Sequence, residues 1–242
     1  MAPLVTRECH VHLIVRENVL YQIVVILQII FAGIGLFVAL FRWRKISWVA
    51  RWAALLLLLS ITGDVSSYVL YHVFRINPNI GGNTYGVVVI SVYGLIYYQA
   101  FNRRYKNFFL IVSALLTLFA AINFIFIQKS ALNSYTSLSV SILVTCYGLM
   151  YFYWLIRELP TTQLHRLPMF WFNSAFMFYF AGTLILNVST TYLVNVLKDD
   201  LSVFWIFHNV LGIIEFMLIA VGLWVDGRTE RDHNLTQKAP AI

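Results

Sequence analysis

Two carboxylates interrupt long apolar stretches of this 242-residue chain. Asp64 falls inside the apolar stretch 46–74, and Glu215 falls inside the stretch 203–225. The remaining acidic residues lie in tails, in short connections or at the ends of apolar stretches. An ionisable group within an apolar span is costly to bury, so Asp64 and Glu215 are the leading candidates for a functional role.

Further polar side chains are expected at depths similar to those of the two carboxylates. His208 precedes Glu215 by seven residues, which is two helical turns on one face, and Asn209 is its neighbour. Asn187 lies in the apolar stretch 169–196. We predict one polar ligand-binding cavity, reached from outside the cell and lined by Asp64, Asn187, His208, Asn209 and Glu215.

A purely structural role is the alternative for each of these residues. Polar side chains in membrane spans also hydrogen-bond across helices, and each such contact contributes about 0.6–2 kcal/mol. We favour this role for His72, which follows Asp64 by eight residues and lies near the end of its stretch. Depth favours function for Asp64 and Glu215, and both roles stay open for His208.

The sequence offers little for a cofactor or a metal ion. Retinal photochemistry needs a lysine in the middle of a span, whereas every lysine here lies in a connection, a tail or the end of a span. Zinc sites of membrane hydrolases need several histidines at ligand spacing, and Gly212 stands four residues after His208. We therefore predict no retinal, no other cofactor and no metal. Three ligands could come from Asp64, His72 and His208 only through tertiary contacts.

The apolar stretches themselves predict the fold. Hydrophobic residues make up 60% of the chain and charged residues 11%, against about 25% charged in soluble domains. A helix of roughly 20 residues crosses a hydrocarbon core of about 30 Å. The stretches of sufficient length are 19–41, 46–74, 85–102, 107–128, 134–157, 169–196 and 203–225. We predict an all-α membrane protein, a bundle of seven transmembrane helices.

Basic residues predict the orientation of this bundle. Of the 17 Lys and Arg residues, 12 fall on one side of the predicted spans and 5 on the other. The richer side is expected in the cytoplasm, so the N-terminus lies outside and the C-terminus inside. The net charge of +7 is thereby explained without a nucleic-acid partner.

Three regions follow from these spans. They are an external N-terminal tail (1–18), a transmembrane domain (19–225) and a disordered cytoplasmic tail (226–242). The outer connection near residues 77–83 is rich in Asn, Pro and Gly, which is typical of a turn.

A short motif recurs within the spans. Tyr93-Gly94-Leu95-Ile96-Tyr97-Tyr98 resembles Tyr147-Gly148-Leu149-Met150-Tyr151-Phe152, 54 positions later. The offset indicates two copies of a helical hairpin, although aromatic-rich helices also produce such similarity by chance.

The C-terminal third carries a family resemblance. Its motifs are Phe170-Trp171-Phe172-Asn173-Ser174, Tyr179-Phe180-Ala181-Gly182-Thr183, Trp205-Ile206-Phe207-His208-Asn209 and Gly222-Leu223-Trp224. This region resembles the multi-helix membrane part of certain bacterial histidine-kinase-type sensor proteins. The resemblance implies a sensory role, and since no kinase module follows, signalling through a separate cytoplasmic partner.

These observations favour one function and leave two alternatives. We predict a sensory or receptor-like module of a bacterial cytoplasmic membrane that binds a small or lipidic ligand and contacts membrane lipid. An intramembrane lipid hydrolase using Asp64, His208 and Glu215 is the first alternative, and a proton-coupled carrier is the second. Ligand binding is preferred to catalysis because the residue spacing matches no catalytic motif.

Overall fold

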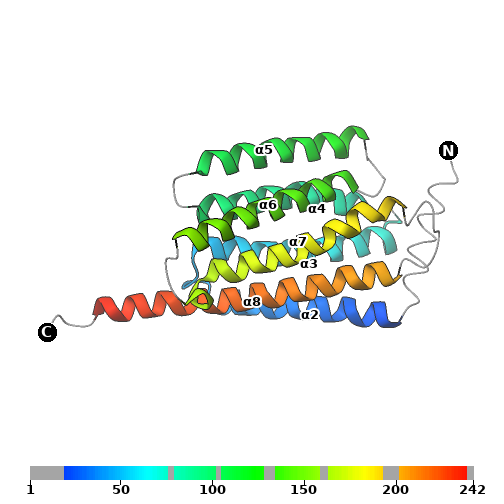
Figure 1. Cartoon of the computed structure of the whole chain (residues 1–242). Coiled ribbons are helices and arrows are strands. Elements are labelled where there is room, and N and C mark those ends of the chain that lie inside the picture. The colour runs from blue at the N-terminus through cyan, green and yellow to red at the C-terminus, as the bar shows by residue number, and fades with distance from the viewer. Residues whose placement is uncertain are drawn as a thin grey trace.

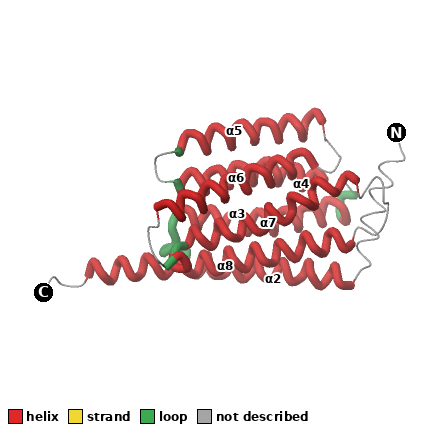
Figure 2. The backbone as a smooth tube through the Cα atoms, in the orientation of Figure 1, coloured by secondary structure: helices red, strands yellow, loops and turns green. Residues whose placement is uncertain are grey.

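The computed structural model describes residues 19–75, 79–101, 105–127, 134–158, 163–192 and 202–238. These residues form seven α-helices with short connections and contain no strand, as Figures 1 and 2 show. The helices are α2 (Val19–Phe41), α3 (Trp48–His72), α4 (Asn79–Ala100), α5 (Lys106–Ile122), α6 (Ser134–Glu158), α7 (Pro168–Tyr192) and α8 (Ser202–Lys238). The all-α prediction is confirmed.

The helices run along a common axis, and each is antiparallel to the next (Figure 1). α2 packs mainly against α8, α7 lies between α6 and α8, and α4 lies between α3 and α5. α5 is at the edge of the bundle, where it contacts mainly α4 and continues into a π-helical turn at Asn123–Ile127. Short connections favour this arrangement, because two helices joined by a short connection pack side by side in opposite directions.

Six of the described helices are long and apolar enough to cross a membrane. The segments are Val19–Phe41, Trp48–Ser67, Asn107–Ile127, Tyr135–Glu158, Pro168–Leu186 and Trp205–Arg228. α4 has sufficient length, with 22 residues, but falls outside this group, and its apolar residues alternate with Asn, Thr, Ser, Gln, Tyr and Gly. Much of its surface is buried, including Asn83 near its start and Tyr97 near its end. A helix that faces protein instead of lipid has less need of apolar side chains.

The start of α4 differs from the sequence prediction. The glycine-rich segment that was expected to form a turn is helical from Asn79 onward. A Cβ atom added at Gly81 would lie 3.1 Å from the Ser67 hydroxyl and 3.4 Å from the Ser66 hydroxyl of α3. Gly81 therefore allows α3 and α4 to approach each other closely. Glycine is also common in turns, so the local sequence could not distinguish the two roles.

The end of α8 also differs from the prediction. The segment from residue 226 was expected to be disordered, yet α8 continues to Lys238 and projects beyond the other helices (Figure 1). Contacts hold the helix at the point where the apolar span ends. The buried Asp226 carboxylate accepts a hydrogen bond from the Ser47 backbone N–H at 2.6 Å, and Gly227 packs against Arg42. The predicted external tail (1–18) lies outside the described residues.

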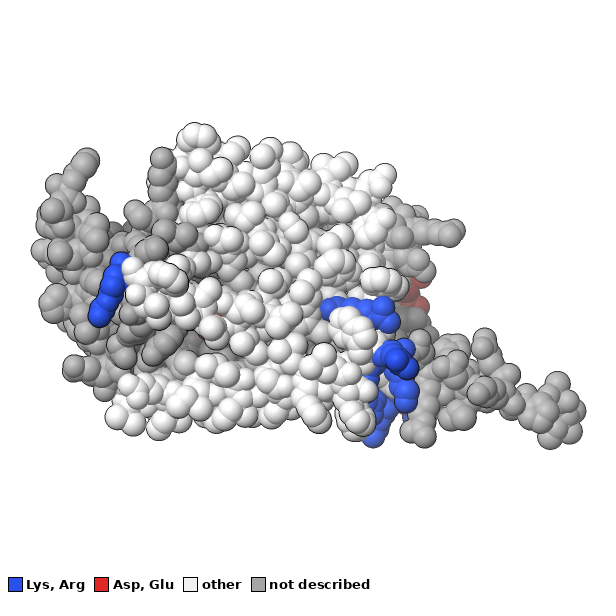
Figure 3. Space-filling model, turned by 180° about the vertical axis from the view of Figure 1, so that it is seen from behind, with Lys and Arg blue, Asp and Glu red and all other residues white. Residues whose placement is uncertain are grey.

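Basic side chains gather at the end of the bundle from which α8 emerges (Figure 3). This basic end, as we call it, includes Arg42, Arg44 and Lys45 between α2 and α3, Arg51 in α3 and Arg228 in α8. Among the described Lys and Arg residues, Arg75 is the one at the opposite end, directly after α3. The two ends of the bundle therefore differ strongly in charge.

Candidate functional site

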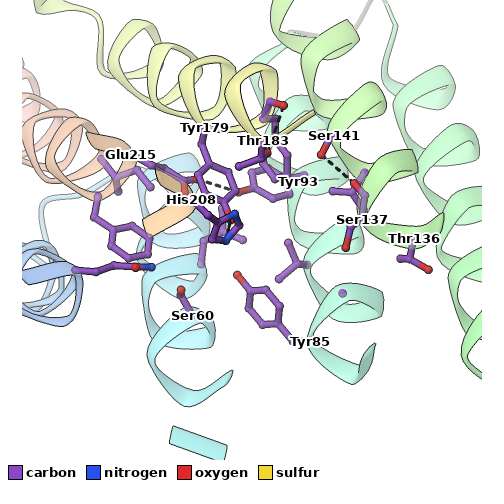
Figure 4. Close-up of a pocket in the computed structure, with 18 residues that line it drawn as sticks. Ser60, Tyr85, Tyr93, Thr136, Ser137, Ser141, Tyr179, Thr183, His208 and Glu215 are labelled. Atoms are coloured by element: carbon purple, nitrogen blue, oxygen red, sulfur yellow. Dashed lines mark hydrogen bonds between the residues drawn. The ribbon is translucent and has the colours of Figure 1, made fainter. Parts of the chain in front are cut away.

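A cavity of about 150 Å³ lies between α3, α4, α6, α7 and α8, and Gln28 of α2 completes its wall (Figure 4). Its lining combines aromatic rings, hydroxyl groups and two ionisable side chains, Glu215 and His208. The serine and threonine residues on its wall are Ser60, Thr136, Ser137, Ser141 and Thr183. Apolar residues of the same helices form the rest of the lining, so polar groups gather at this cavity in an otherwise apolar bundle.

Glu215 is the carboxylate of this cavity. Its side chain is 5% exposed, and its Oε1 atom accepts a hydrogen bond from the Tyr93 hydroxyl of α4 at 3.2 Å. The Tyr93 ring is held edge-on by two rings of α7, Phe176 at 4.9 Å and Phe180 at 5.1 Å between centroids. Aromatic packing thus fixes the hydroxyl that meets the carboxylate.

His208 lies on the same wall of α8 as Glu215, as the seven-residue spacing predicts. Its Nε2 atom is 3.2 Å from the Tyr179 hydroxyl of α7, within hydrogen-bond distance. The imidazole also packs edge-on between the rings of Tyr179 and Trp205, each with its centroid 5.6 Å away. Each of these two ionisable groups therefore lies within hydrogen-bond distance of a tyrosine hydroxyl.

Tyr85 of α4 joins the cavity to α3. Tyr85 of α4 and Ser60 of α3 both line the cavity (Figure 4). A Cβ atom at Gly63 would lie 3.3 Å from the Tyr85 ring, so glycine at this position lets the ring approach α3.

Several hydroxyl groups of the wall already donate their hydrogen atoms. Ser141 donates to the Ser137 carbonyl oxygen at 2.9 Å, and Thr183 donates to the Phe180 carbonyl oxygen at 3.4 Å. Tyr93 donates to Glu215. A hydroxyl oxygen whose hydrogen is committed presents only lone pairs, as a carboxylate does. These three hydroxyl oxygens therefore act as acceptors on the cavity wall.

Asp64 does not lie where the sequence led us to expect it. Its side chain is exposed on α3 and is not among the residues that line the cavity around Glu215. The physical reason is that α3 is apolar on most faces, so its sequence gives no phase from which to derive the direction of one side chain.

The other predicted residues are placed to different degrees. Asn209 is buried, but it is not part of the cavity wall. Asn187 belongs to α7 and His72 ends α3, and the side chains of both lie outside the described residues. Within the part of the chain that the structure describes, no three His, Cys, Asp or Glu side chains come together as a metal site would require.

Sequence reasoning missed the tyrosines of the site. Tyr85, Val89 and Tyr93 follow one another at four-residue intervals and line the cavity together. Ser137 and Ser141 repeat this spacing on α6. Hydroxyl side chains recurring every four residues within an apolar span are a helical polar stripe, and this signal was present in the sequence.

Comparison with known proteins adds no further constraint. No protein-family model matches the chain, and no curated protein or solved structure does either. The chemistry of the cavity is therefore the basis on which a function has to be argued.

Proposed function

We propose that this chain is a sensory module of seven transmembrane helices that binds a small ligand in the cavity around Glu215. Six helices meet the requirements of a membrane span, and α4 is the seventh span of the proposal because its neighbours shield it from lipid. The observation that carries the proposal is the buried Glu215 carboxylate, which accepts a hydrogen bond from the Tyr93 hydroxyl on the cavity wall. Pockets of this kind, mostly apolar with a few convergent polar groups, are typical of ligand sites.

The buried carboxylate indicates the chemistry of the ligand. A ligand with hydroxyl or ammonium hydrogens could donate to Glu215, whose Oε1 atom lies on the cavity wall beside the Tyr93 hydroxyl. Tyrosine rings beside a carboxylate also favour a cation, because the ring face is electron-rich. We therefore propose a small ligand that carries hydrogen-bond donors, with an ammonium group preferred.

α8 is the proposed output element. It carries His208 and Glu215 at the cavity, and further along it carries Asp226, which binds the Ser47 N–H before α3. The helix then continues past the bundle to Lys238. A ligand that shifts the cavity wall of α8 would also shift this projecting segment, where a cytoplasmic signalling partner could detect it.

We propose that the basic end of the bundle faces the cytoplasm of a bacterial cell. The asymmetry between the basic end and the opposite end, where Arg75 is the one basic residue among those that the structure describes, supports it. Arg75→Cys and Arg166→Cys, each in a chain with Cys9 and Cys146 changed to Ser, test it. A membrane-impermeant maleimide should label the first in intact cells and spare the second. The reverse labelling pattern would invert the orientation.

A thermal-unfolding experiment tests ligand binding. Purified protein in a neutral detergent is heated with ethanolamine, choline or glycerol, and with acetate as a small solute that lacks such donors. We expect at least one donor-bearing solute to raise the unfolding temperature, and acetate to leave it unchanged. Glu215→Gln should abolish the increase, because the neutral amide loses the charge and replaces one acceptor oxygen by a donor.

Glu158→Gln provides the matched control. Glu158 is an exposed carboxylate at the end of α6, away from the cavity, and the same change of charge there should leave the ligand effect intact. The binding proposal fails if no donor-bearing solute stabilises the protein, or if Glu215→Gln responds as the parent does.

The hydrolase alternative receives less support. It requires Asp64 beside His208 and Glu215, and Asp64 is not part of the cavity wall. The carrier alternative relied on two carboxylates in one cavity, and the lining contains Glu215 alone as a carboxylate among the described residues.

A further inference from the structure

Arginine and tryptophan side chains are interleaved at the basic end of the bundle. Arg42 stacks on the Trp224 indole, with its guanidinium carbon 3.9 Å from the ring centroid, and Arg228 lies 5.1 Å from the same ring. Arg51 lies 5.0 Å from the Trp48 ring and 5.6 Å from the Trp43 ring in the same manner. The cluster draws on the ends of α2, α3 and α8.

Most cations of this cluster lack an anionic partner. Arg44, Lys45 and Arg228 form no ion pair with any carboxylate whose side chain the structure describes. Arg51 donates one long hydrogen bond, 3.5 Å, to the Trp43 carbonyl oxygen. Its buried Nε atom has no acceptor among the described residues. The acidic residue at this site is Asp226, whose carboxylate accepts the Ser47 N–H. Positive charge therefore exceeds negative charge at this end.

The tryptophan rings define the surroundings in which these cations lie. Trp43, Trp48 and Trp224 are 47%, 65% and 42% exposed, and each lies at an end of a helix that is long and apolar enough to cross a membrane. Exposed indoles at such positions are typical of the lipid headgroup region. An anion that meets these cations is thus found at the membrane surface, next to the hydrocarbon.

We propose that the basic end binds the phosphate of an anionic phospholipid. Arg44, Lys45 and Arg51 would contact the headgroup, and Trp43 and Trp48 would pack against the first acyl carbons. Arginine suits this task because its planar N–H groups match two phosphate oxygens at once. The indole faces keep the guanidiniums oriented without neutralising them.

The site differs from a nucleic-acid surface in its exposed apolar area. The side chains of Phe41 and Trp48, 79% and 65% exposed, flank the cations on the two sides of the connection between α2 and α3. These groups would remain in water against a polyphosphate, whereas lipid chains bury them. Apolar exposure beside unpaired cations therefore favours a lipid over a soluble anion.

Titration with lipid tests the site. The unfolding temperature of the purified protein in a neutral detergent is followed against added phosphatidylglycerol, phosphatidylcholine or inorganic phosphate. We expect a saturable increase with phosphatidylglycerol and a much smaller one with the other two. Each cation near a membrane surface strengthens anionic-lipid binding about fivefold, so Arg44→Gln/Lys45→Gln/Arg51→Gln should raise the half-saturating phosphatidylglycerol concentration about a hundredfold.

Matched variants keep the result interpretable. Arg75→Gln removes a cation from the opposite end and should leave the titration unchanged. If the triple variant fails to fold, Arg51→Gln alone should show a shift of about fivefold. An equal response to phosphatidylcholine or to phosphate, or an unchanged titration in the variants that fold, would overturn the proposal.

Discussion

Two tyrosines one turn apart on α4 belong to clusters of opposite character. Tyr97 is fully buried and donates to the Asn173 Oδ1 atom at 2.6 Å, while Asn173 donates to the Gly148 carbonyl oxygen at 3.2 Å. Tyr93 is also buried, but it donates to Glu215 on the wall of the cavity. We call the group of Tyr97, Asn173 and Gly148 the sealed cluster, and the group of Tyr93 and Glu215 the cavity cluster.

The difference separates groups that stabilise the bundle from groups that bind. In the sealed cluster every polar group named above meets a protein partner, and the Tyr97 ring also packs against Tyr147 and Phe109. The cavity cluster retains empty volume and an ionisable group, which cost stability and are typical of functional sites. Substitutions in the two clusters should accordingly affect different measurements.

The largest loss of stability is expected in the sealed cluster. Asn173→Leu removes both hydrogen bonds and leaves the Tyr97 hydroxyl and the Gly148 carbonyl oxygen without these partners. Each buried group left unpaired costs about 1–3 kcal/mol. The free energy of unfolding in detergent should fall accordingly. A loss below about 0.5 kcal/mol would show that the cluster does not hold the bundle together.

A slightly smaller loss is expected from Gly148→Ala. A Cβ atom at this position would meet the Met177 side chain and lie 3.3 Å from the Asn173 Oδ1 atom. Overpacking of this kind costs about 1–3 kcal/mol. Gly33→Ala on α2 is the control, because its Cβ would meet no atom within 4 Å and alanine favours a helix by roughly 0.5–1 kcal/mol. Equal losses in both variants would contradict this account.

Tyr97→Phe and Tyr93→Phe compare the two clusters directly. Each removes one hydroxyl, and Tyr97→Phe should lower the free energy of unfolding by about 1 kcal/mol. Tyr93→Phe should cost about 0.6 kcal/mol, typical of a hydrogen bond within a membrane, yet weaken stabilisation by the donor-bearing solutes. The opposite assignment, with solute response lost in Tyr97→Phe alone, would exchange the roles of the clusters.

The smallest effect is expected at Asp64. Because its side chain is not part of the cavity wall and lies within the apolar span Trp48–Ser67, Asp64→Asn removes a costly charge and should not lower the free energy of unfolding. It should also leave the solute response intact, whereas Glu215→Gln abolishes that response. A loss of response in Asp64→Asn would restore Asp64 to the ligand site.

Part of the site could be derived from the sequence. Glu215 stood out as a carboxylate deep in an apolar span, and a fixed helical spacing carried His208 to the same wall. Relations within one helix follow from its geometry alone. Relations between helices do not, which is why the sequence could not show that Asp64 lies off the cavity wall, and why Tyr85 and Tyr179 were overlooked.

The sequence by itself determined the helical class and most helix bounds, because backbone groups in an apolar surrounding must pair within their own segment. Only the tertiary structure decided how far each helix is rotated about its axis. That rotation directs Tyr93 toward Glu215 and Tyr97 toward Asn173. It also brings Gly81 against α3 and the Asp226 carboxylate to the Ser47 N–H. The physical reason is that helices apolar on all faces carry no phase in their sequence, so packing between neighbours selects the rotation.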